Sequence, residues 1–153
     1  MTLFIFAFLL GFVSGLRSMT PIAAVSIGAF VGHIKVEKSF VAFLAESPAP
    51  YVLSVLALAE LVFDKLRFTP SRKATGPFLG RILTGALCGA AIGASEDLLV
   101  VTALVGALGA VFGTLGGSSA RESVAASFKK DWPAALIEDA FAICGAALLV
   151  ALA

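Results

Sequence analysis

The sequence predicts an all-α integral membrane protein, and two observations lead to that class. Of the 153 residues, 59% are hydrophobic and only 14% are charged, whereas soluble domains contain about 25% charged residues. The mean hydropathy is +1.03. An apolar excess of this size has to face lipid, so the bilayer is the first expected partner. The net charge of +1 gives no indication of nucleic acid binding. We expect a single transmembrane domain over residues 1–153.

Five apolar segments are predicted to be transmembrane helices. Lipid offers no hydrogen-bond partners, so each segment has to satisfy its own backbone groups by forming a helix. A short interfacial helix is expected at residues 40–44, before the prolines at positions 48 and 50. The five predicted spans are residues 3–32, 50–66, 77–94, 98–120 and 132–152.

The distribution of basic residues predicts an orientation. With five spans, the N-terminus lies on the same side as the loop 65–76 and residues 129–130, and the C-terminus lies on the other side. The positive-inside rule then predicts a multi-pass protein of the plasma (inner) membrane, with a cytoplasmic N-terminus and the C-terminus outside. The basic residues on the predicted cytoplasmic side are Lys65, Arg67, Arg72, Lys73, Lys129 and Lys130.

The first segment is predicted to be kinked or broken near its middle. A straight helix over residues 3–32 would be about 45 Å long, compared with a hydrocarbon core of about 30 Å. Pro21 lacks a backbone N–H and disfavours helix at Thr20. A helix beginning near Ser18 would present an N-terminus that attracts anions. Small and polar residues crowd the same turn: Ser14, Gly15 and Ser18.

Glycines recur every four residues in the third and fourth segments. Such ridges let membrane helices approach closely. They serve either packing within one chain or a homodimer interface. Because a chain of this size has few helices with which to line a pathway, we expect a homodimer through these faces. The two ridges are Gly85, Gly89 and Gly93, and Gly109, Gly113 and Gly117.

The charges also indicate an internal repeat. The stretch GFVSGLRS aligns with LGGSSARE, which places Ser14 over Ser118 and Arg17 over Arg121. A second alignment places Glu60 over Glu138. Three crossings separate equivalent positions, so the halves would be inverted, as in many transporters. The fourth helix is then expected to be interrupted as well, at Gly116 and Gly117. The predicted arrangement is repeat 1 over about 3–66, a linking helix over about 77–94 and repeat 2 over about 98–152.

The buried arginines have two interpretations. A charge as deep as Arg17 costs at least about 2.5 kcal/mol on insertion scales, so it should face protein or water and have a partner. That partner is either an internal carboxylate or a bound anion or headgroup. Glu60 and Asp64 share one face of the second span, and the deeper Glu60 is the better candidate. Asp64 is also compatible with an interfacial position beside Lys65. Glu138 and Asp139 point about 100° apart, so one of them can face the core.

These considerations define the candidate site. We expect neither metal nor cofactor nor catalytic residues, because His33 stands alone and Cys88 and Cys144 lack metal-ligand spacing. The candidate substrate-binding residues are Arg17, Ser14, Ser18, Thr20, Arg121, Ser118 and Ser119. The candidate proton-carrying or charge-balancing residues are Glu60, Asp64, Glu138 and Asp139. The candidate helix interruptions are Gly15, Pro21, Gly116 and Gly117.

Two stretches of the sequence resemble a known family. GLRSMTP, and AELVFDKLRFTPSRKATGPFLGRILTGALCGAA further on, resemble an uncharacterised family of small bacterial membrane proteins known as domain of unknown function 4126. The resemblance implies a multi-pass membrane protein and implies no activity. The family's marked positions that it carries over to this chain are Gly15, Arg17, Pro21, Glu60, Asp64, Lys65 and Arg81.

Three functions are compatible with these residues to different degrees. We expect a small transporter or channel for a small anionic or acidic solute, in which the arginines attract the anion and Glu60 and Glu138 balance charge or carry protons. The alternative is a non-transporting protein that binds a lipid headgroup or a protein partner, with the buried charges as internal salt bridges. A lipid-modifying enzyme would need a groove ending at Glu60 or Glu138, and we do not expect an enzyme.

Overall fold

The computed structural model describes residues 1–36, 39–65, 74–128 and 131–153. Within these residues the chain forms helices, turns and loops and no strand, which confirms the all-α prediction. Most of the basic loop predicted at 65–76 lies outside the described residues. The helices are α1 (Thr2–Leu16), α2 (Met19–Phe30), η1 (Phe40–Ala45), α3 (Ala49–Phe63), α4 (Thr75–Gly93), η2 (Ala94–Glu96), α5 (Leu99–Phe128) and α6 (Asp131–Leu152).

Three helical segments of the described chain are long and apolar enough to cross a membrane: Thr75–Glu96, Leu99–Val124 and Trp132–Leu152. The helix α3 is shorter, with 15 residues, and exposes large apolar side chains such as Val55, Leu58 and Val62. Exposed apolar surface of this extent is unfavourable in water and favourable against lipid. The long apolar helices therefore indicate a membrane protein.

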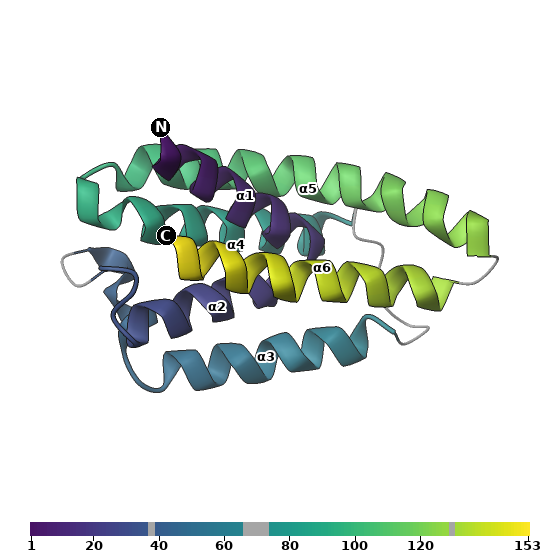
Figure 1. Cartoon of the computed structure of the whole chain (residues 1–153), viewed down its shortest axis with the longest axis horizontal. Coiled ribbons are helices and arrows are strands. Elements are labelled where there is room, and N and C mark those ends of the chain that lie inside the picture. Colours follow the sequence, from purple (N-terminus) through teal and green to yellow (C-terminus); the bar gives the residue numbers. More distant parts are fainter. Residues whose placement is uncertain (37–38, 66–73, 129–130) are drawn as a thin grey trace.

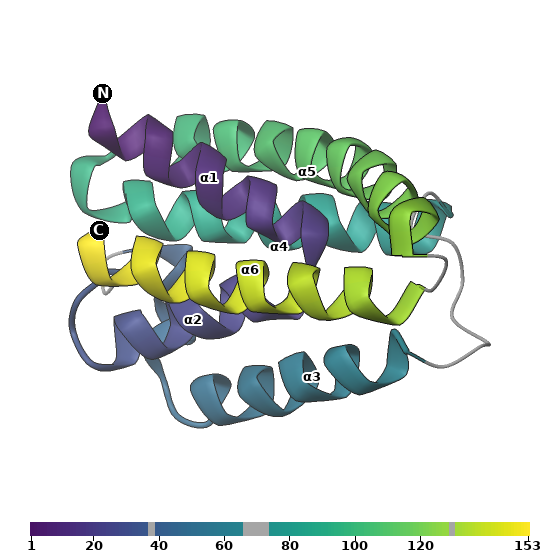
Figure 2. The ribbon, with the colours of Figure 1, turned by 45° about the vertical axis from the view of Figure 1, so that its right-hand side comes forward.

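The first apolar segment forms a hairpin of two half-length helices. The 15 residues of α1 extend about 22 Å and the 12 residues of α2 about 18 Å, at 1.5 Å per residue. Figures 1 and 2 show that α2 runs back toward the end of the molecule at which α1 begins. The predicted break in this segment is confirmed. The hairpin is too short to be two ordinary spans, because a span needs about 20 residues.

Both termini lie at the same end of the bundle, because the α1–α2 hairpin returns and α3 to α6 then run alternately along its length (Figures 1 and 2). The five-span prediction placed the termini on opposite sides. That arrangement required the first segment to continue through its break in one direction. The sequence showed that the chain breaks there but held no indication of the direction in which it continues.

Glycines hold α1, α4 and α5 in close contact. A Cβ atom built on Gly11 would lie 2.0 Å from the carbonyl oxygen of Gly106, and one on Gly89 would lie 2.1 Å from that of Thr102. Real atoms do not approach this closely, so no side chain fits at these positions. Every glycine of the two predicted ridges packs against another part of its own chain, although Gly117 closely approaches only the end of a leucine side chain. The ridges serve packing within the chain, and a homodimer would need another surface.

The helix α5 passes through Gly116 and Gly117 without interruption, so the predicted break in the fourth helix is wrong. The hydroxyls of Ser118 and Ser119 donate to the carbonyl oxygen of Leu115, at 2.9 and 3.1 Å, and these bonds stay within the helix. No proline occurs in this stretch to remove a backbone donor. The second interruption that the inverted repeat predicted is therefore absent from α5.

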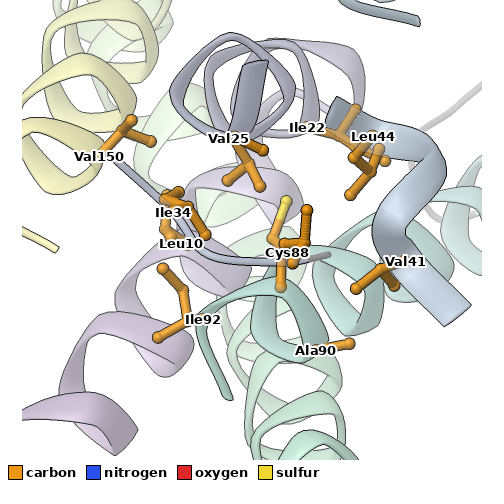
Figure 3. Close-up of a cluster of buried hydrophobic side chains, with 13 residues drawn as sticks. Leu10, Ile22, Val25, Ile34, Val41, Leu44, Cys88, Ala90, Ile92 and Val150 are labelled. Carbon is orange, nitrogen blue, oxygen red and sulfur yellow. The ribbon is translucent and has the colours of Figure 1, made fainter. Parts of the chain in front are cut away.

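An apolar cluster fills the part of the bundle nearer the termini. It joins Leu10 of α1, Val25 of α2 and Val150 of α6 to residues of α4, all nearly or fully buried. Figure 3 shows these side chains converging around Cys88 and Ile92. The segment η1, which the sequence predicted as a short helix, contributes Val41 and Leu44. The cluster closes the core between the termini and the turn of the hairpin.

Candidate functional site

The helix α1 ends at a cation supplied by another helix. Arg17 has extended backbone angles, with φ −140° and ψ 115°, so the helix stops at Leu16. The last carbonyl groups of a helix lack partners within it and carry partial negative charge. Nη1 of Arg81, on α4, donates to the carbonyl oxygens of Gly15 at 2.5 Å and Leu16 at 2.8 Å. Arg81 is 3% exposed and caps α1.

The helix α2 begins at an anion supplied by a third helix. The side chain of Glu60, on α3, accepts hydrogen bonds from the backbone N–H of Ser18 at 2.9 Å and of Met19 at 2.8 Å. The Ser18 hydroxyl donates to the same carboxylate at 2.8 Å. A carboxylate at this position satisfies orphan donors and complements the helix dipole. The predicted helix start at Ser18 is confirmed, and the anion that it attracts is the chain's own Glu60.

The Arg17 side chain is completely buried between two aspartates. Its Nη1 contacts Oδ2 of Asp64, just past α3, and its Nη2 contacts Oδ1 of Asp139 on α6. The prediction that Glu60 would be the better partner for Arg17 is therefore wrong. Glu60 lies one turn before Asp64 and reaches the start of α2, whereas Asp64 reaches the guanidinium.

Further ion pairs extend from these aspartates. Nζ of Lys65 lies 3.0 Å from Oδ2 of Asp139. Nη1 of Arg121 lies 3.9 Å from Oδ2 of Asp64 and 3.7 Å from Oε2 of Glu138. We define the ion network as these connected side chains, whose three cations and three anions balance in charge within the part of the chain that the structure describes. Its members are Arg17, Asp64, Lys65, Arg121, Glu138 and Asp139.

The ion network runs from a buried centre to a partly exposed edge. The exposed fraction of the side chain is 0% for Arg17, 8% for Asp139, 12% for Asp64 and 32% for Lys65. Lys65 follows α3 at the end of the bundle opposite the termini, as the course of α3 in Figure 1 shows. Buried charges in a membrane protein are costly unless they are paired. The pairing is tightest at Arg17, where burial is complete.

The structure brings most of the predicted site residues together. Arg17 and Arg121 share Asp64 as a partner, as expected for two arginines of one site. Ser14 lies beside the site, with its Oγ 2.6 Å from Oγ1 of Thr84. The Thr20 hydroxyl is buried and has no hydrogen-bond partner among the described residues. Gly15 and Pro21 flank the turn, and Gly15 packs against the backbone of α5.

Several predicted residues lie outside the ion network, among them two serines of α5. The hydroxyls of Ser118 and Ser119 return to their own helix, and no helix N-terminus forms beside them because α5 is continuous. Conversely, Arg81 was marked only by the family resemblance and was not predicted as a site residue. The rule that singled out Arg17, an arginine within an apolar segment, applies equally to Arg81.

Two pockets lie on either side of the apolar cluster. A pocket of about 250 Å³ between α1, α5 and α6 has mostly apolar walls and includes Arg121 and Glu138 of the ion network. A polar pocket of about 530 Å³ lies at the end with the termini, where it is lined by His33, Lys35 and Glu96 among others. Arg121 of the ion network therefore lines a largely apolar pocket, whereas the polar pocket lies at the far end.

Comparison with known proteins identifies the family. Neither a curated protein nor a solved structure matches the chain. A family model described as domain of unknown function (DUF4126) matches residues 4–153, which is nearly the whole chain and confirms the resemblance seen in the two sequence stretches. The chain belongs to the DUF4126 family.

Proposed function

We propose that this protein moves a small anionic or acidic solute across the membrane and that the solute binds at the ion network. The observation that carries the proposal is the position of Arg17. It is fully buried at the turn between two half-length helices and is held by aspartates from two different helices. Intramembrane charges at helix interruptions are typical of transport sites.

The chemistry of the ion network suits an exchange of anions. A guanidinium binds carboxylate and other oxyanions through paired N–H donors, and Arg17 presents these donors to Asp64 and Asp139. A solute anion would take the place of one aspartate. Protonation of the displaced aspartate would keep the network neutral, so solute and proton would move together. Lys65 and Arg121, each already next to one of these aspartates, would stabilise whichever carboxylate stays ionised.

The arrangement of pockets supports a gated path. The polar pocket with His33 and Lys35 offers an approach from the end with the termini. Ile34 and Ile92 line that pocket and also belong to the apolar cluster, which includes Leu10 and Val25 (Figure 3). In this conformation the approach is closed. Movement of the α1–α2 hairpin would open it, because α1 and α2 contribute side chains to the cluster.

Flux from proteoliposomes tests the proposal. A panel of small anions, including chloride, acetate and phosphate, would be measured with and without a pH gradient. The informative variant combines Arg17→Gln with Asp139→Asn, because removal of one cation and one anion keeps the net charge of the site unchanged and Asp64 retains Arg121 as a neighbour. We expect proton-linked flux of at least one anion in the wild type and a loss of about tenfold or more in the double variant.

The control for this experiment is Asp97→Asn, which makes the same carboxylate-to-amide change in the exposed turn between η2 and α5. Its flux should equal that of the wild type. Flux unchanged in the double variant would remove Arg17 from the mechanism. If the double variant does not fold, Arg17→Lys keeps the charge but loses the paired donors, and it should also reduce flux.

A second candidate function is favoured by the internal pairing of the buried charges. Both guanidinium ends of Arg17 have a carboxylate of the chain, and Glu60 is occupied by the start of α2. In this second function the ion network only stabilises the fold, and the protein binds a lipid or a protein partner and transports no solute. This function predicts no flux of any anion by a folded wild type. It also predicts that the Arg17→Gln and Asp139→Asn double variant is more stable than either single variant.

A further inference from the structure

We propose that the pocket between α1, α5 and α6 binds a membrane phospholipid whose headgroup carries both a phosphate and a primary ammonium. The lipid would place part of an acyl chain in the pocket, with its phosphate at Arg121 and its ammonium at Glu138. This lipid site goes beyond the proposed transport function and does not depend on it.

The walls of the pocket suit an acyl chain. Phe12 and Leu16 of α1 face Ile137 and Phe141 of α6 across a space of about 250 Å³. Ligand pockets usually measure about 300–1,000 Å³, so this space accommodates a segment of chain rather than a whole lipid. Ile137 is 55% exposed and Phe141 58% exposed. The pocket therefore reaches the outer surface of the helices, which lipid would cover.

Gly116 leaves the pocket open on the α5 side. A Cβ atom built on Gly116 would meet no atom within 4 Å, whereas one on Gly113 would lie 2.0 Å from the carbonyl oxygen of Phe12. Gly113 thus serves helix packing, and Gly116 does not. The missing side chain of Gly116 contributes space to the pocket.

The charges in the pocket wall select the headgroup. Arg121 and Glu138 both line the pocket, with side chains 18% and 9% exposed, and the nearest charged atoms are 3.7 Å apart. A headgroup with one negative and one positive group matches this pair and leaves the balance of the ion network unchanged. A purely anionic headgroup would place a negative charge beside Glu138 and Asp64, whose carboxylates lie 3.7 and 3.9 Å from Arg121. A choline headgroup has no N–H to donate to Glu138.

Lipid retention measured by native mass spectrometry tests this inference. The purified full-length protein would be delipidated in detergent and titrated with phosphatidylethanolamine, phosphatidylglycerol and phosphatidylcholine of identical acyl chains. We expect phosphatidylethanolamine to be retained about tenfold more strongly than either competitor, which corresponds to one charge-assisted hydrogen bond. Equal retention of the three lipids would overturn the assignment of the headgroup.

Two matched variants test the location. Gly116→Leu should fill the pocket and abolish the preference. Gly80→Leu is the control, because Gly80 also has nothing within 4 Å but lies on α4 outside this pocket, and it should retain the lipid. Retention unchanged in Gly116→Leu would overturn the proposal. If that variant does not fold, Ala120→Leu, at another exposed position of the pocket wall, serves the same purpose.

A third variant separates the two headgroup contacts. Glu138→Gln removes the negative charge that would hold the ammonium, so the preference for phosphatidylethanolamine over phosphatidylcholine should fall about tenfold. A preference that survives this substitution would contradict the assignment of the ammonium to Glu138. Absence of anion flux through the protein would leave all of these expectations unchanged, so the two proposals fail separately.

Discussion

Arg17 and Arg121 lie in similar stretches of sequence, but the helix ends at the first arginine and continues through the second. Each arginine follows an apolar stretch and a run of glycine and serine, yet α1 ends at Leu16 whereas α5 continues to Phe128. The difference shows that glycine and serine do not by themselves end a membrane helix. At Ser118 and Ser119 the hydroxyls bond to a carbonyl of their own helix, so the helix keeps its backbone bonds.

The break at Arg17 is stabilised by two other helices. Arg81 of α4 takes up the carbonyl groups at the end of α1, and Glu60 of α3 takes up the N–H groups at the start of α2. In the hydrocarbon region, a freed backbone group without such a partner costs several kcal/mol. The α1–α2 hairpin is therefore a product of tertiary contacts as much as of local sequence.

The largest expected effect comes from removing the buried arginine. Arg17→Ala leaves Asp64 and Asp139 without their shared cation, and the loss of one partner from a buried pair costs about 3–5 kcal/mol. Arg121→Ala should cost less than Arg17→Ala, because the Arg121 side chain is 18% exposed rather than fully buried and lies 3.7 and 3.9 Å from the carboxylates of Glu138 and Asp64. The free energy of unfolding in mixed micelles measures both. Equal losses would mean that the two arginines are equivalent.

The next effect separates the two roles of glycine in α5. Gly113→Ala forces a methyl group against the backbone of Phe12, and such overpacking costs about 1–3 kcal/mol. Gly116→Ala adds a methyl group in open space and should be neutral or slightly stabilising, because alanine favours helix over glycine by about 1 kcal/mol. Thermal unfolding of the two variants in the same detergent compares them. A destabilised Gly116→Ala would contradict the assignment of Gly116 to the pocket.

The Glu60 cap on α2 should contribute a smaller amount to the free energy of unfolding. Glu60→Gln keeps a hydrogen-bond acceptor but removes the charge that complements the helix dipole, a loss of about 0.5–2 kcal/mol. Hydrogen exchange should increase at the backbone N–H groups of Ser18 and Met19, which donate hydrogen bonds to Glu60. Exchange at the start of α6 should stay unchanged. Uniform destabilisation of all helices would indicate that Glu60 acts on the whole bundle instead.

The smallest effect is expected from the proline itself. Pro21 lies in the first turn of α2, where the backbone N–H has no helical partner in any case. Pro21→Ala should change the free energy of unfolding by less than about 1 kcal/mol. A pair of spin labels, one at each end of the hairpin, should report the same distance as in the proline-containing protein. A large increase in that distance would show that proline, and not the two capping side chains, maintains the turn.

The sequence predicted the helical class, the break near Ser18 and five of the six residues of the ion network, all but Lys65, because each of these follows from a local energetic cost. Apolar segments have to form helices in lipid, a proline removes a donor, and a buried charge needs a partner. The choice of partner was not predictable. Glu60 and Asp64 share one helical face, and which of them reaches Arg17 depends on how α3 lies against α2 and α6.

By itself, the sequence determined that the chain forms apolar helices typical of a membrane protein and that its first segment is interrupted near Ser18, because both consequences follow from the energetics of neighbouring residues. Only the tertiary structure decided that α2 turns back, that the ridges of glycine pack inside the chain and that Arg17 lies between Asp64 and Asp139. These features depend on contacts between helices far apart in sequence. Hydropathy defines where a helix lies in the chain, and packing defines which of its faces meets which neighbour.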